Sequence, residues 1–196
     1  LAAACLLASP SISSADQIVT MDLVLGDNGV TSGAYWYSAT NVQDANGTAL
    51  GGAGHVICFE HGAQNPPFGG STQTYVVGAN IFANPAAWES GQGLVNWLVD
   101  QYYADYFSDP SGTFSDASAF QSVLWILQAE YDGTNLAALN FTSGDPLLGG
   151  FTDVATANAL LASVQNANIS SDYRSSKYLL EFLASEPHTV QNMIYI

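Results

Sequence analysis

One short segment of the chain gathers the side chains best suited to chemistry. It reads His55-Val-Ile-Cys-Phe-Glu-His61 and places Cys58 within three residues of two histidines. A thiolate is a strong nucleophile and metal ligand, and an imidazole titrates near neutral pH and can carry protons. These residue types indicate either a thiol assisted by His55 or His61, or a metal site.

Cys58 also fits less reactive roles. A thiol outside a disulfide is most often a small buried hydrophobe, and Cys5 is available as a disulfide partner. A cysteine hydrolase usually has its base far away in the sequence, and a zinc site built from His55, Cys58 and His61 lacks a fourth ligand. Acidic turns such as the one at Asp44 lack the spacing of a known calcium loop but remain candidates for one Ca²⁺. We expect no metal and no cofactor.

Different elements are expected to position Cys58 and Gln121. Residues 55–59 form a short apolar run, which is typical of a buried strand. Residues 116–131 (DASAFQSVLWILQAEY) carry apolar side chains at helical spacing, which predicts a helix with Gln121 in its first turns. The sequence thus predicts a strand that carries Cys58 and a helix that carries Gln121 in distant parts of the chain.

The whole pattern predicts an α+β fold, in which a β-sandwich or barrel-like framework carries a helical insertion. Alternating apolar residues and turn signals predict strands near both ends of the chain, and helical spacing predicts helices between them. Residues 64–70 are expected to be a loop, and no linker divides residues 16–196, which we expect to be one domain. The expected strands are residues 17–25, 33–40, 55–59, 73–77, 178–183 and 190–196, and the expected helices are residues 94–107, 116–131 and 152–167.

The segments around Cys58 and Gln121 resemble the thioester domains of bacterial surface adhesins. The motifs are an apolar residue, Cys, an apolar residue and an acid (57–60), followed by an apolar residue, Gln and a Trp four residues later (120–125). The resemblance implies that the Cys58 sulfur and the Gln121 side-chain carbonyl form an internal thioester with loss of ammonia. An amine or hydroxyl attacks such an acyl group and becomes covalently linked through Gln121. The residues that would support the bond are His55, Glu60, His61 and Trp125.

A second resemblance covers residues 17–196. The segments 59–60, 96–103, 119–126 and 130–132 look like those of PEP-CTERM surface proteins, which are Gram-negative exports that an exosortase sorts by a C-terminal tail. This resemblance implies an extracellular or cell-surface location.

The charge balance restricts the partners. The chain has 17 acidic and 2 basic residues, with a formal net charge of −15. Only Arg174 and Lys177 are available to neutralise phosphates, which excludes nucleic acid and a direct grip on anionic lipid headgroups. Lys177 is also the sole lysine, and a chain so poor in amines is consistent with an activated acyl group aimed at a partner's amine.

The N-terminal residues 1–15 are similar to the apolar and cleavage regions of a secretory signal peptide, with Ser13 and Ala15 at the small-residue positions. The alternative is a retained assembly segment that pairs with the sheet edge of a neighbouring subunit. No other stretch reaches the roughly 18 apolar residues of a membrane span, so none is expected in the mature chain.

Together these patterns predict an exported cell-surface or extracellular-matrix protein that attaches covalently to amines or hydroxyls of extracellular surface or matrix molecules. We do not expect an enzyme, because the acyl group is consumed once. The alternative is a non-reactive structural subunit of an extracellular filament or matrix, a homopolymer assembled by inter-subunit strand pairing.

Overall fold

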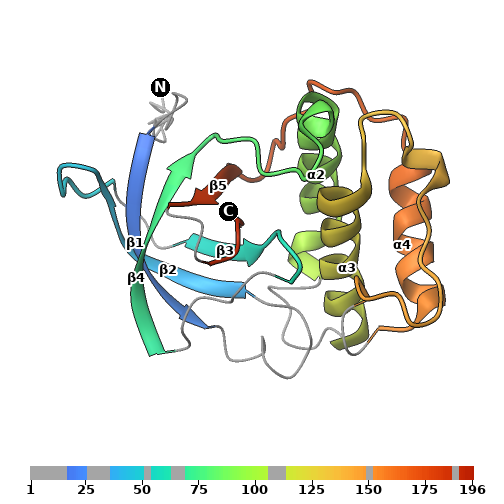
Figure 1. The fold of residues 1–196 in the computed structure, drawn as a ribbon, viewed down its shortest axis with the longest axis horizontal. Coiled ribbons are helices and arrows are strands. Elements are labelled where there is room, and N and C mark those ends of the chain that lie inside the picture. Colours follow the sequence, from blue (N-terminus) through green and yellow to red (C-terminus); the bar gives the residue numbers. More distant parts are fainter. Residues whose placement is uncertain are drawn as a thin grey trace, which may run out of the picture.

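The chain folds into an antiparallel β-barrel with a layer of helices against one side (Figure 1). The computed structural model describes residues 17–25, 36–50, 54–62, 69–105, 114–148, 152–186 and 190–196. The barrel closes in the order β1-β2-β3-β6-β5-β4, and β4 pairs with β1. The strands are β1 (Gln17–Leu25), β2 (Trp36–Asp44), β3 (Gly54–Cys58), β4 (Gly69–Val77), β5 (Glu181–Ser185) and β6 (Met193–Tyr195), and the helices are the 3₁₀ turns η1 (Pro85–Ala87) and η3 (Leu136–Ala138) and the α-helices α2 (Trp88–Tyr103), α3 (Phe114–Glu130) and α4 (Val154–Asn166). This architecture confirms the predicted α+β class.

The alternation of side chains along β3 joins two hydrophobic cores. Val56 and Cys58 belong to the core inside the barrel, whereas Ile57 and Phe59 belong to the core between the barrel and the helices. Successive side chains of a strand point to opposite faces, so a single strand serves both cores. As a result, Cys58, the last residue of β3, has its side chain in the core inside the barrel. The next residue, Phe59, already belongs to the core between the barrel and the helices.

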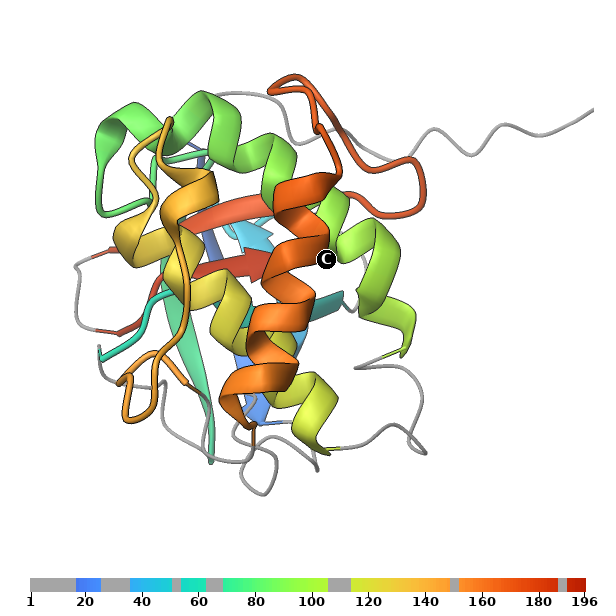
Figure 2. The same cartoon turned by 90° about the vertical axis from the view of Figure 1, so that its right-hand side faces the viewer.

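Helix α3 occupies the interior of the helical layer. Phe120, Leu124 and Leu127 are fully buried, as predicted, but the polar residues Ser118 and Gln121 are fully buried as well. The helix is therefore covered on every side rather than amphipathic, as expected for a helix apolar around most of its surface. Figure 2 shows α4 lying across α3 on the side away from the barrel.

Local chemistry explains the main differences from the predicted elements. Helix α2 begins at Trp88 rather than near residue 94, because η1 leads directly into it and Asn84 caps η1 by accepting a hydrogen bond from the Ala86 amide at 3.0 Å. Strand β4 includes Gly69 and Gly70, which the sequence predicts to be loop, because this segment pairs with β1 from Val24 onward. Residues 1–15, and with them the signal-peptide and assembly-segment predictions, lie outside the described residues.

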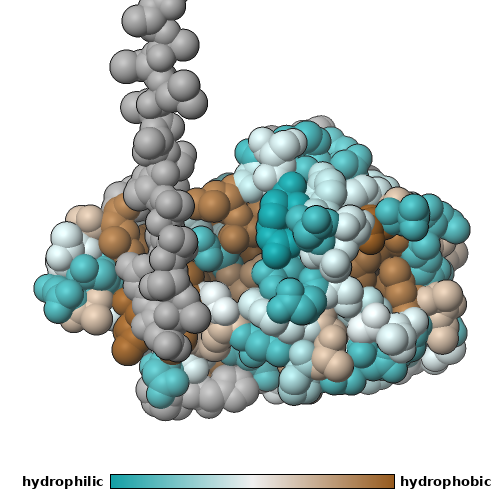
Figure 3. Space-filling view, turned by 90° about the horizontal axis from the view of Figure 1, so that it is seen from above, coloured by the Kyte–Doolittle hydropathy of each residue, from teal (hydrophilic) through white to brown (hydrophobic). Residues whose placement is uncertain are grey.

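On the face shown in Figure 3, hydrophobic residues gather over the barrel half and in a second patch on the helical half, and hydrophilic residues cover most of the rest. Ile18 and Val24 on the outer face of β1 are 40% and 49% exposed. Among the described residues, no helix combines the length and apolarity that a bilayer crossing requires.

A buried carboxylate ties α2 to the segment that follows α4. Asp100 accepts hydrogen bonds from the Tyr173 hydroxyl at 2.6 Å, the Ser175 hydroxyl and the Ser176 amide at 3.3 Å. Burial acts to raise the pKa of Asp100, but these donors outweigh it and hold that pKa below its usual value. The Asp100 carboxylate thus contributes stability above the unfolded-state pKa that is lost as the pH falls through the folded-state pKa.

We expect Asp100→Ala to lower the free energy of unfolding by about 1–3 kcal/mol at neutral pH, because it leaves partly buried donors without an acceptor. The control is Asp105→Ala, which removes the same charge from an exposed position near the end of α2. Urea unfolding at pH 7 and pH 3 measures both variants. The difference between Asp100→Ala and the parent should shrink at pH 3, and equal differences at both pH values would contradict the assigned role.

Candidate functional site

The structure brings the side chain of Gln121 against Cys58. The Gln121 Nε2 donates a hydrogen bond to the Cys58 carbonyl oxygen at 2.5 Å, across 63 residues of sequence. Cys58 is the last residue of β3, and Gln121 lies in the second turn of α3. Both residues are 0% exposed, so this junction between the barrel and the helical layer is closed to bulk water.

Only one of the two polar atoms of the Gln121 side-chain amide, Nε2, forms a hydrogen bond with the described residues. Its Oε1 is buried and has no hydrogen-bond partner among the described residues. Leaving a buried acceptor without a donor costs about 1–3 kcal/mol.

The thiol of Cys58 lies in apolar surroundings. It belongs to the barrel-interior core with Tyr75 and Met193 and forms no disulfide with the described residues. Burial raises the pKa of the Cys58 thiol well above its usual value, because a low-dielectric interior penalises the thiolate. Burial likewise raises the pKa of Tyr75, and the charge of a Cys58 thiolate would add to that effect. The predicted alternative partner, Cys5, lies outside the described residues.

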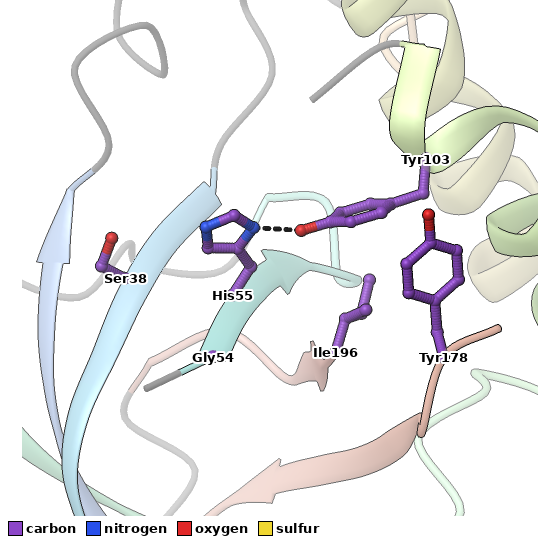
Figure 4. A pocket seen from close by; sticks show the side chains of 6 residues that line it. All are labelled: Ser38, Gly54, His55, Tyr103, Tyr178 and Ile196. Atoms are coloured by element: carbon purple, nitrogen blue, oxygen red, sulfur yellow. Dashed lines mark hydrogen bonds between the residues drawn. The ribbon is translucent and has the colours of Figure 1, made fainter. Parts of the chain in front are cut away.

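His55 does not lie at the Cys58–Gln121 junction. His55 and Ile57 are two residues apart on β3, so their side chains lie on the same face of the strand, opposite to the Cys58 side chain. The His55 Nδ1 shares a hydrogen bond with the Tyr103 hydroxyl of α2. The two residues line an open cavity of about 320 Å³ together with Tyr178 and Ile196 (Figure 4). Partial burial lowers the pKa of His55. The predicted supporting role of His55 in a thioester therefore has no geometric support.

His61 lies beside the helix that carries Gln121. Its ring meets the ring of Trp125 edge to face, with centroids 4.8 Å apart. Trp125 is only 4% exposed and follows Gln121 by one helical turn, whereas His61 is exposed. Partial burial lowers the pKa of His61, and the nearby charge of Asp145 acts in the opposite direction.

Glu60 positions the backbone that follows Cys58. Its Oε2 accepts a hydrogen bond from the Asn192 amide at 3.2 Å, and the Phe59 amide donates to the Asn192 carbonyl at 3.0 Å. These bonds fasten the end of β3 to the segment entering β6. The Glu60 carboxylate thus binds a backbone amide. No local sequence pattern indicates Asn192 as its partner.

The described residues contain no group of three or more His, Cys, Asp or Glu side chains able to hold a metal ion. The zinc interpretation fails on geometry, since His55 and His61 contact different helices. Two of the acidic turns bind their own backbone instead of converging on a cation: Asp44 Oδ1 accepts from the Asn46 and Thr48 amides, and Asp132 Oδ1 from the Thr134 and Asn135 amides.

The fold is similar to that of known thioester domains. The structure aligns with the N-terminal thioester domain of the fibronectin-binding protein SfbI from Streptococcus pyogenes, with a TM-score of 0.51 and 12% identity over 94% of this chain and 95% of that one. It also aligns with the pilus-presented adhesin Cpa, with a TM-score of 0.47 and 16% identity over 81% of this chain and 40% of that one. Comparison of the sequence with protein families and with characterised proteins found no match. The likeness to SfbI establishes the fold, an antiparallel barrel with helices.

Proposed function

We propose that this protein is an extracellular, cell-surface attachment module in which Cys58 and Gln121 form an internal thioester. The observation that carries the proposal is the 2.5 Å hydrogen bond from the Gln121 side-chain amide to the Cys58 backbone carbonyl, buried at the junction of β3 and α3. The thioester-domain fold and the orphan Gln121 Oε1 support the same conclusion.

The chemistry requires two steps. In the first, the Cys58 sulfur attacks the Gln121 side-chain carbon, the carbon–nitrogen bond breaks, and the thiol proton leaves with the amide nitrogen as ammonia. Bond formation requires the Cys58 side chain to turn from the barrel interior toward the amide. Holding the two groups together supplies the entropic part of the barrier. In the second step an external amine attacks the thioester carbon, yielding an amide on Gln121 and a regenerated Cys58 thiol.

The protein's own amines are kept away from this step. Lys177 is the sole lysine, and its Nζ donates to the Asp100 backbone carbonyl of α2 at 2.5 Å. A tethered ammonium is a poor nucleophile, so the stored acyl group would be reserved for a partner. Extracellular molecules with accessible amines or hydroxyls are the class of partner that this reaction would link.

One observation favours a second candidate function. The raised pKa of Cys58 and its place among apolar side chains also fit an inert buried thiol. In that case the same fold would be a non-reactive structural subunit of an extracellular assembly, and Gln121 would serve only to join β3 to α3.

Methylamine labelling separates the two functions. We expect the folded protein to incorporate one methylamine on Gln121, located by peptide mass spectrometry, and to gain one thiol that can be alkylated at Cys58. The matched control is Gln128, also buried on α3 and also donating to a backbone carbonyl, which should take up no label. If the folded protein gains no label and Cys58 is alkylated equally before and after treatment, the thioester is contradicted. The second candidate function, a non-reactive structural subunit, is then the one that fits.

A further inference from the structure

We infer that His61 is the base that accepts the proton of the incoming amine when the Cys58–Gln121 thioester is opened. This inference rests on the proposed thioester and adds to it a catalytic residue at a stated position. The sequence offers His55 and His61 as equal candidates for proton transfer, and the structure separates them.

Position along α3 favours His61. Gln121 and Trp125 are four residues apart and therefore lie on the same face of the helix, about 6 Å apart along its axis. The His61 ring packs against the Trp125 ring with centroids 4.8 Å apart, so the imidazole lies beside the face of α3 that carries Gln121. His55 instead projects from the opposite side of β3 toward Tyr103 (Figure 4).

Exposure favours His61 as well. Cys58 and Gln121 are fully buried and Trp125 is nearly so, whereas His61 is exposed. An amine that approaches from solvent on this side therefore meets the imidazole before it meets the acyl group. Trp125 gives the ring a rigid platform, which a surface histidine otherwise lacks.

The electrostatic surroundings suit a base. Among the described residues, the charge that acts on the ring is that of Asp145, and the carboxylate of the preceding residue, Glu60, accepts the Asn192 amide. Partial burial lowers the pKa of His61 and favours the neutral imidazole, whereas the charge of Asp145 acts in the opposite direction and favours the imidazolium.

The proton balance is complete. The amine lone pair attacks the Gln121 carbon, and the carbon–sulfur bond breaks with its electrons going to the Cys58 sulfur. His61 takes the proton released from the amine nitrogen and passes it to the thiolate. The products are a substituted amide on Gln121, a Cys58 thiol and a neutral His61.

The rate of methylamine incorporation tests this role. We expect His61→Gln to form the thioester, seen as loss of one ammonia, but to react with methylamine about 10²-fold more slowly, the usual contribution of a positioned base. The matched control His55→Gln should react at the parent rate. A parent protein without ammonia loss overturns the proposed function, whereas a His61→Gln variant that reacts at the parent rate overturns only this inference.

The pH profile gives a second readout that a purely structural role would not move. Corrected for the fraction of free amine, the parent rate should rise through the pKa of His61 to a plateau. Asp145→Asn removes the charge that raises the pKa of His61, so the rising limb should shift to lower pH while Oδ1 still accepts the Leu147 amide. If His61→Gln fails to fold, an unshifted limb in Asp145→Asn overturns the inference by itself.

Discussion

Cys58→Ala will abolish methylamine incorporation completely and lower the free energy of unfolding by about 4 kcal/mol. The first effect follows because, in the proposed thioester, the sulfur is the atom that activates the Gln121 carbonyl. The second follows because a bond between residues 58 and 121 closes a loop of 63 residues, and removing a cross-link of that span returns about 4 kcal/mol of chain entropy to the unfolded state.

The stability effect has an independent control in the parent protein. Methylamine cleaves the same cross-link without changing Cys58, so the treated parent should unfold at a lower urea concentration than the untreated parent. The unfolding midpoint of Cys58→Ala should not respond to methylamine. Identical midpoints for the treated and untreated parent would show that no cross-link joins β3 to α3.

Gln121→Glu will destabilise the protein by about 3–5 kcal/mol at neutral pH, which is typical of a buried charge without a partner. The introduced carboxylate would face the Cys58 carbonyl oxygen, where the Gln121 amide now donates. Burial would raise the pKa of this carboxyl above its unfolded value of about 4.3, because the charged form loses its water. The variant should therefore be most stable at low pH and lose stability as the pH rises.

The comparison is best made in a Cys58→Ala background, which removes the contribution of a cross-link. Urea unfolding between pH 3 and pH 8 then reports the buried charge alone. Gln101→Glu, at an exposed position of α2, is the matched control and should be nearly neutral at every pH. A Gln121→Glu variant as stable as this control would contradict the buried contact between α3 and β3.

The sequence predicted the fold class because period-two and helical patterns are distinct in most of the chain. β1 matches its predicted bounds, and the predicted helix 116–131 is the observed α3 with small shifts at its ends. The failures are at Gly69 and Gly70, where pairing with β1 outweighs local loop preference, and at the start of α2, where a 3₁₀ turn leads into the helix.

Residue types alone predicted only part of the candidate site. The pairing of Cys58 with Gln121 came from a resemblance and stays a prediction, and the structure places the Gln121 amide on the Cys58 backbone carbonyl. Only the structure distinguishes the positions of His55 and His61. His55 lies on the face of β3 opposite to the Cys58 side chain and contacts Tyr103, whereas His61 packs against Trp125. The binding of Glu60 by Asn192 depends on β6 lying beside β3, which no local pattern reveals.

The intact mass of the freshly purified, folded protein under non-reducing conditions tests the central claim most directly. The account predicts a mass lower than that calculated from the sequence by one ammonia, with the full calculated mass in Cys58→Ala and in Gln121→Ala. A parent mass equal to the calculated value, with Cys58 alkylated as a thiol once the protein is unfolded, would contradict the thioester.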